Sequence, residues 1–154
     1  MLIIISTLFV WNLVELTIVY LLFKKKKTLF DDRFTMTMGT AITSVSSMVI
    51  ALHVKLLLPV DQAVFYLSPI IVGLLIGWKF GSLLKAPAAL NGIYNGVIGG
   101  VMGTMLGAVL MNPALCKIPI ETESLIETNM LSLAIFSACL LTLVCRIVRY
   151  SFRV

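Results

Sequence analysis

Charged side chains are scarce in this sequence. Asp, Glu, Lys and Arg make up 12% of the 154 residues, whereas hydrophobic residues make up 60% and the mean hydropathy is +1.07. Soluble domains carry about 25% charged and about 45–50% apolar residues. The apolar residues also fall in long blocks instead of scattered core positions, which is typical of membrane-spanning segments. The composition therefore excludes a water-soluble fold of this size.

Cysteine and histidine are also rare, and this excludes several kinds of site. The three cysteines do not form the even set of a small disulfide-bonded domain. Cys139 and Cys145 are about 120° apart around a helix, so they cannot bridge each other there. His53 is the only histidine, and a lone histidine is a poor metal site. Because Lys55 follows closely, we expect His53 at the wet edge of the membrane.

Motifs for catalysis or cofactor binding are missing as well. The sequence has no nucleophile elbow, phosphate-binding loop, paired catalytic carboxylates or zinc motif. Eight methionines raise the alternative of a Cu(I) site, because thioethers are soft ligands. However, Met36 and Met38 lie about 200° apart on a helix and no CxxC is present, so flexible packing filler explains methionine better. We expect no enzyme activity, no cofactor and no metal.

Five apolar blocks reach the length of about 17–25 residues that a membrane-spanning helix needs. They cover residues 2–23, 34–58, 63–84, 90–111 and 129–148. The first block has no basic residues before it and no cleavage site, which is typical of an uncleaved anchor. The sequence predicts an all-α integral membrane protein, a bundle of about five transmembrane helices forming a single polytopic domain over residues 1–154. The alternative is four spans, with one weak segment lying in the membrane interface.

The basic residues predict how the helices are oriented. With the N-terminus outside, ten of the twelve Lys and Arg residues lie on the cytoplasmic side, as the positive-inside rule favours. Only Lys55 and Lys117 then lie outside. The run Lys24–Lys27 is a topological stop signal or, alternatively, a site for anionic lipid. Membrane topology thus explains the net charge of +5 without nucleic acid, and we expect a multi-pass protein of a bacterial cytoplasmic membrane with its C-terminus inside.

Glycines at intervals of three and four residues mark two of the apolar blocks. The block 90–111 has six glycines, all within an arc of about 100° of one helix, and the block 63–84 has three at four-residue spacing. Small residues at this spacing let helix backbones approach closely in lipid, where no hydrophobic force joins helices. We therefore predict a glycine-zipper pair. The expected helix-packing residues are Gly73, Gly77, Gly81, Gly92, Gly96, Gly99, Gly100, Gly103 and Gly107.

Two other blocks carry polar stripes. In the block 34–58, small and hydroxyl side chains share one half of the helix, among them Thr43, Ser44 and Ser47. In the block 129–148, a stripe within an arc of about 80° consists of Ser132, Cys139, Thr142 and Arg146. Hydroxyl groups in lipid bond back to their own helix or across a helix interface. The stripes therefore indicate a packed bundle interior or, alternatively, a polar pathway along the block 34–58.

Two ionisable groups lie inside the predicted spans. Glu15 lies near the middle of the first block, one turn from Asn12 on the same face. A hydrogen bond to Asn12, or an ion pair with Lys79 at similar depth, would satisfy its carboxyl group. Glu15 then has either a structural role or a role in transport or proton relay. Lys79 either pairs with Glu15 or snorkels to the inner interface beside Trp78.

Two classes of function remain. One is an accessory or oligomeric membrane subunit, which uses leftover helix faces to bind a second copy of itself or another membrane protein. The other is a small transporter or channel, in which Glu15 and the hydroxyl face of the block 34–58 line the path. In both cases the lipid bilayer surrounds the protein, and nucleic acid is not a partner.

Overall fold

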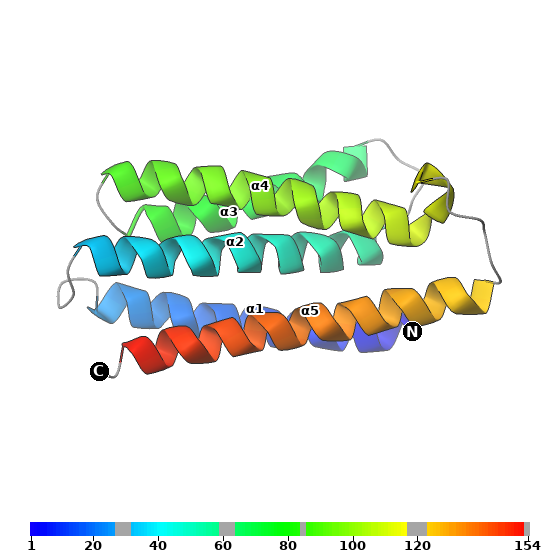
Figure 1. Cartoon of the computed structure of the whole chain (residues 1–154), viewed down its shortest axis with the longest axis horizontal. Helices are drawn as coiled ribbons and strands as arrows, with labels where there is room; N and C mark the ends of the chain where they lie inside the picture. Colours follow the sequence, from blue (N-terminus) through cyan, green and yellow to red (C-terminus); the bar gives the residue numbers. More distant parts are fainter. Residues whose placement is uncertain (27–31, 59–63, 84–85, 117–122, 153–154) are drawn as a thin grey trace.

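Five long helices form the protein, as seen in a computed structural model that describes residues 1–26, 32–58, 64–83, 86–116 and 123–152. The α-helices are α1 (Leu2–Lys26), α2 (Asp32–Leu57), α3 (Val64–Gly81), α4 (Ala86–Met111) and α5 (Glu123–Ser151). A short 3-10 helix, η1 (Pro113–Cys116), follows α4. Successive α-helices run in opposite directions, so the chain ends lie at opposite ends of the bundle (Figure 1). As a result α1 and α5, which contact each other, run in the same direction.

Four of these helices, α1, α2, α4 and α5, are long and apolar enough to cross a membrane. The prediction of an all-α membrane bundle is therefore confirmed. The exception among the described helices is α3, whose 18 residues rise about 27 Å at 1.5 Å per residue, against a hydrocarbon core of about 30 Å. Pro69 lies inside α3 and removes one backbone N–H donor from it. Residues 63 and 84, the ends of the predicted span, lie outside the described residues.

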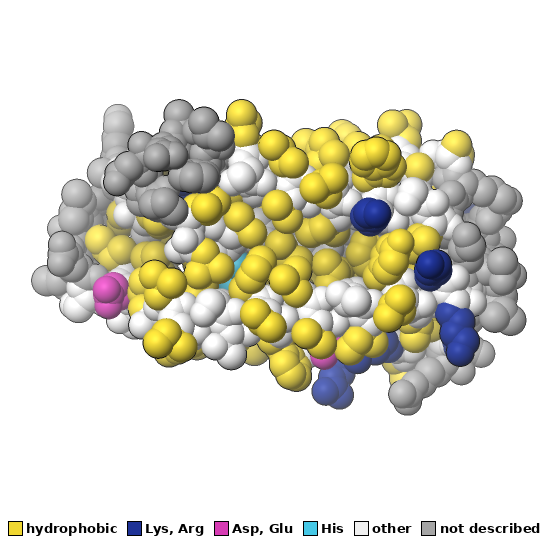
Figure 2. Space-filling view, turned by 180° about the vertical axis from the view of Figure 1, so that it is seen from behind, with side chains coloured by type: hydrophobic (Ala, Val, Ile, Leu, Met, Phe, Trp, Pro, Cys, Tyr) yellow, Lys and Arg dark blue, Asp and Glu magenta, His cyan; other side chains and the backbone are white. Residues whose placement is uncertain are grey.

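Compared with a soluble protein the polarity is reversed: many large apolar side chains are exposed and many polar side chains are buried. Large apolar side chains cover the outside, for example Ile3 at 80% exposure and Leu90 at 72%, and Figure 2 shows such side chains over most of one face. The polar side chains that are less than 4% exposed are Asn12, Thr35, Thr43, Ser46, Ser47, His53, Lys55 and Ser137. An apolar surface is compatible with lipid. Polar groups within the membrane must find partners inside the protein.

The central helix of the bundle is α2. It contacts all four other α-helices, and 61% of its most apolar stretch is buried, against 28–33% for the other three spans. Several of its hydroxyl groups bond back to their own helix: Thr40 donates to the carbonyl oxygen of Met36 at 2.8 Å, and Ser47 to that of Ser44 at 3.1 Å. A hydroxyl bonded in this way can be buried without an unpaired donor. The polar half of α2 is therefore enclosed by protein.

The backbones of α3 and α4 meet along a line of small residues. A Cβ atom built on Gly73 would lie 2.7 Å from the carbonyl oxygen of Gly96, and one built on Gly96 would lie 2.8 Å from the Cα of Gly77. One built on Gly81 would lie 2.8 Å from the Cα of Ala89. Because real Cβ atoms do not approach backbone atoms so closely, only glycine permits this helix spacing.

The glycines of α4 form two rows with different neighbours. The row toward α3 is Gly92, Gly96 and Gly100, and the row toward α2 is Gly99, Gly103 and Gly107. A Cβ built on Gly99 would collide with the Ser47 side chain and lie 2.6 Å from the carbonyl oxygen of Ser44. One built on Gly107 would lie 2.8 Å from the Cγ of Lys55. Both rows are thus used within one chain, so the leftover helix faces expected for binding a second protein do not include this glycine face of α4.

One end of the bundle is basic. At this end α1 and α3 finish, α2 begins and α5 runs to its last turn (Figure 1). The described basic residues on this side are Lys24, Lys25, Lys26, Arg33, Lys79, Arg146 and Arg149. Lys27, Lys85, Lys117 and Arg153, which entered the charge count, lie outside the described residues.

Aromatic rings close the basic end. The ring centroid of Phe23 lies 4.8 Å from that of Phe152 and 5.8 Å from that of Phe80, both edge to face. Lys26 donates through Nζ to the carbonyl oxygen of Phe152. Edge-to-face ring pairs contribute about 0.5–1.5 kcal/mol beyond their buried area. These contacts hold the ends of α1, α3 and α5 together.

Leucine in place of Gly96 is expected to force α3 and α4 apart. The new side chain has no room between the two backbones, and overpacking of this kind costs about 1–3 kcal/mol or more. We expect purified Gly96→Leu to lose its helical circular dichroism at a lower temperature than the wild type in the same detergent. Met105→Leu is the control, because Met105 lies on the same helix and is 66% exposed. Equal melting temperatures for both variants would contradict the backbone contact.

Candidate functional site between α1 and α5

A carboxylate lies inside the membrane-spanning part of α1. Glu15 is the fourteenth of the 25 residues of this helix and is 7% exposed. A charged group at that depth is expensive unless it is paired, and such groups mark functional sites in many membrane proteins. The chemistry of this site therefore depends on which group pairs with Glu15.

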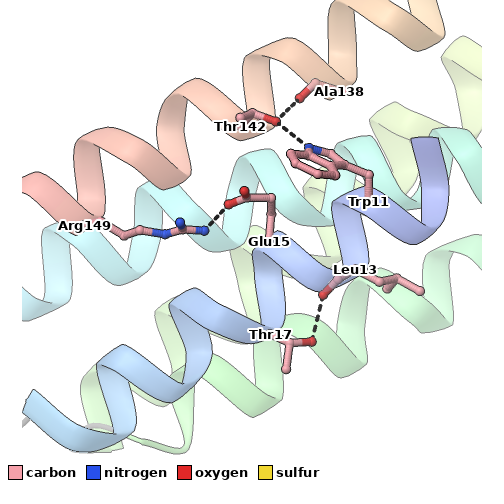
Figure 3. A network of polar contacts seen from close by, with 7 residues as sticks. All are labelled: Trp11, Leu13, Glu15, Thr17, Ala138, Thr142 and Arg149. Carbon is pink, nitrogen blue, oxygen red and sulfur yellow. Dashed lines mark hydrogen bonds and ion pairs between the residues drawn. The ribbon is translucent and has the colours of Figure 1, made fainter. Parts of the chain in front are cut away.

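The partner is Arg149, in the last turn of α5. Its Nη2 atom donates to Oε2 of Glu15, and this ion pair joins residues 134 positions apart (Figure 3). Side chains on a helix lean toward its N-terminus, and α1 and α5 run in the same direction. Arg149 therefore reaches back from the basic end to the level of Glu15. Neither Asn12 nor Lys79, the partners expected from the sequence, takes this place.

A second polar contact lies one turn away on the same two helices. Trp11 donates through Nε1 to the hydroxyl oxygen of Thr142 at 3.3 Å. Thr142 in turn donates to the carbonyl oxygen of Ala138 at 2.9 Å. Figure 3 shows both contacts, Trp11 to Thr142 and Glu15 to Arg149, spanning the space between α1 and α5. Two polar contacts in otherwise apolar surroundings thus join these helices.

A groove of about 450 Å³ opens beside these contacts. Its walls include Leu8 and Trp11 of α1 and all of the polar stripe predicted on α5 except Ser132, namely Cys139, Thr142 and Arg146. Arg146 is exposed, whereas Glu15 is paired. The described part of this seam therefore carries one carboxylate and two guanidinium groups, and its net charge is positive.

An unpaired amide lies next to the ion pair. Asn12 is fully buried, three residues before Glu15 on the same face of α1, and neither its oxygen nor its nitrogen makes a hydrogen bond in the described part of the chain. Leaving a buried polar group unpaired costs about 1–3 kcal/mol. Such groups are rare in folded proteins and call for a functional or solvent partner. Asn12 and Glu15 together make this seam the strongest candidate site.

The other residues of the predicted pathway lie elsewhere. The side chain of Ser47 and the carbonyl oxygen of Ser44 lie against Gly99 of α4, and Ser47 also approaches the carbonyl oxygen of Asn95 at 3.5 Å. Thr43 lines a small cavity of about 10 Å³ among α2, α3 and α4. Lys79 is exposed on α3 and lines a different groove, against α1. The structure thus divides the predicted set: Asn12 and Glu15 lie together in the seam between α1 and α5, and the other four residues lie outside it.

His53 and Lys55, expected at the wet edge of the membrane, are buried instead. Neither is more than 1% exposed. Nδ1 of His53 lies 2.8 Å from the carbonyl oxygen of Val49, and the stem of Lys55 packs where Gly107 leaves space. The reason is that neighbouring helices enclose α2 up to this end. Within the described ranges, no three His, Cys, Asp or Glu residues are arranged to hold a metal ion.

Arg149 is the functional residue that the sequence reasoning missed, because it entered only the charge count. The spacing of the arginines in the sequence does point to Arg149. Arg149 follows Arg146 by three residues and so continues the polar stripe of the fifth block. The sequence alone does not show that this stripe faces α1.

A double-mutant cycle tests the coupling of Glu15 and Arg149. Glu15→Gln and Arg149→Met are each expected to lower the melting temperature, because each leaves one partner unpaired. The double variant should lose less stability than the sum of the single variants, with a coupling of about 0.5–3 kcal/mol. Arg146→Met, which removes an exposed arginine from the same helix, should show no coupling to Glu15→Gln. Strictly additive effects of Glu15→Gln and Arg149→Met would show that the pair contributes nothing.

Comparison with known proteins finds no matching family model, no similar curated protein and no similar solved structure.

Proposed function

We propose that this chain is a non-transporting membrane subunit, which works by presenting helix surfaces to a partner within the bilayer. The observation that carries the proposal is the packing of α2 against α4. On the hydroxyl face of α2, the candidate lining of a transport path, Ser47 packs against Gly99 of α4, and Thr40 accepts a hydrogen bond from Nδ2 of Asn91 at 2.6 Å. These side chains are thus occupied in joining helices.

The space around these hydroxyl groups supports the same proposal. A transport path needs polar groups that line room for the solute or its hydration shell. The cavity beside Thr43 measures about 10 Å³, which is close to the smallest volume that holds one water molecule. In this proposal the chain catalyses no reaction.

The partner would lie in the membrane, because the exposed surface is apolar. On α1, Ile3 is 80% and Val10 is 58% exposed, and this helix has the smallest buried share of the four candidate spans. The partner is then a second copy of the chain or another membrane protein, which covers part of α1. In the proposed orientation the basic end faces the cytoplasm of a bacterial cell, as the positive-inside rule favours.

A second candidate function is transport of protons or another small ion along the seam between α1 and α5. The unpaired amide of Asn12 beside the ion pair favours it. A proton bound by Glu15 would release Arg149 and so loosen α1 from α5. Ionisable groups that exchange partners in this way form proton relays in membrane proteins.

Flux measurements on reconstituted protein distinguish the two candidates. Liposomes containing the wild-type chain should be as tight to protons and K⁺ as empty liposomes, measured with a pH-sensitive dye inside them. Light scattering of the complex extracted from its native membrane should give a protein mass above the 16.9 kDa of one chain. A lone monomer that conducts ions would refute the subunit proposal. Flux that Glu15→Gln abolishes and Ser47→Leu leaves intact would establish transport along the seam.

A further inference from the structure

A groove of about 340 Å³ runs between α1 and α3 on the face shown in Figure 2. Its walls include Leu16, Thr17 and Tyr20 of α1 and Val72, Ile76 and Lys79 of α3. The volume lies within the range of about 300–1,000 Å³ that is typical of ligand sites. Most of the lining is aliphatic or aromatic, and an ammonium group and a phenol group lie toward the basic end.

Charge gathers at one end of this groove. Lys79 is in the last turn of α3, and Lys24 follows Tyr20 by one turn on α1. The lining has no Asp or Glu among the described residues. Figure 2 shows Lys and Arg side chains at this end of the face and hydrophobic side chains along its middle. An apolar trough with a positive end is complementary to a molecule with an apolar tail and an anionic head.

The groove walls favour a lipid chain over a protein helix. Helices of this protein come close where glycine removes the side chain, as at Gly73 and Gly96. The described walls of the groove contain no glycine, alanine or serine. A second helix about 10 Å wide could not approach these walls as closely as α4 approaches α3. A flexible acyl chain fits between branched side chains without such a requirement.

We propose that the groove between α1 and α3 binds an anionic phospholipid, with its phosphate against Lys79 and an acyl chain along Leu16 and Ile76. Anionic lipids concentrate in the cytoplasmic leaflet, and each lysine near the surface strengthens their attraction. The bound lipid fills the space between two helices that have few direct contacts with each other. It thereby supports α1 on the side away from Arg149. This proposal does not depend on the function proposed above.

Quenching of Trp78 fluorescence measures lipid binding close to Lys79, the neighbour of Trp78 in the sequence. Trp78 precedes Lys79 and is 57% exposed, and Trp11→Phe removes the other of the two tryptophans. The full chain in this background is reconstituted into phosphatidylcholine vesicles that contain either brominated phosphatidylglycerol or brominated phosphatidylcholine. We expect stronger quenching by the anionic lipid. Equal quenching by both lipids would overturn the proposal.

Two variants separate binding in the groove from attraction to the charged surface. Lys79→Gln should lower the preference for the anionic lipid about fivefold. Thr17→Phe keeps the charge but fills the groove, because Thr17 lines it, and should also weaken the preference. Lys25→Gln removes a charge about 140° around α1 from Tyr20 and should leave the preference unchanged. If Lys25→Gln matches Lys79→Gln, or if Thr17→Phe has no effect, the lipid senses only surface charge and the proposal fails.

A reporter on the other face checks that the effect is local. In a Trp78→Phe background, Trp11 reports on the groove between α1 and α5. Lys79→Gln should leave quenching of Trp11 unchanged, and equal melting temperatures show that the variants are folded. A change at Trp11 equal to that at Trp78 would overturn the assignment to the groove between α1 and α3. A third outcome is that no lipid preference is found and that only Thr17→Phe loses a larger assembly. This outcome would overturn the proposal and assign the groove to a second protein.

Discussion

Close contact between helix backbones at glycine residues holds the interior of this protein together. In lipid no hydrophobic force joins helices, so the distance between them decides how strongly they attract. The two glycine rows of α4 bring it against α3 on one side and α2 on the other. Because α2 is held in the centre, its hydroxyl groups and its histidine are enclosed, and the surface left to the lipid is apolar.

The two outer helices, α1 and α5, are attached differently. They meet each other through side chains, at the Glu15–Arg149 ion pair and at the Trp11–Thr142 hydrogen bond. Long side chains keep helix axes farther apart than glycines do, so grooves remain on both sides of α1. The protein therefore combines a tightly packed unit of α2, α3 and α4 with a more open pair. The candidate lipid groove and the candidate transport site both lie beside α1, in the open part.

The membrane fold could be predicted from the sequence because hydropathy acts locally, residue by residue. Neighbour relations between helices are not local, and there the prediction was weaker. Glycine spacing indicates a small face on α4 but not that two helices share it. Counting residues placed Lys79 at the depth of Glu15, yet Arg149 reaches Glu15 because α1 and α5 run in the same direction. The nearby Lys55 predicts His53 at the membrane edge, whereas the burial of His53 depends on the helices around α2.

The sequence separation of the ion pair has a consequence for biosynthesis. Glu15 belongs to α1, which leaves the ribosome before α5, and Arg149 in α5 follows 134 residues later. At about 5–20 residues per second, translation of that interval takes on the order of ten seconds. For this time the nascent chain holds an acidic side chain without its counter-charge. The ion pair can therefore lock α1 in place only when α5 arrives beside it.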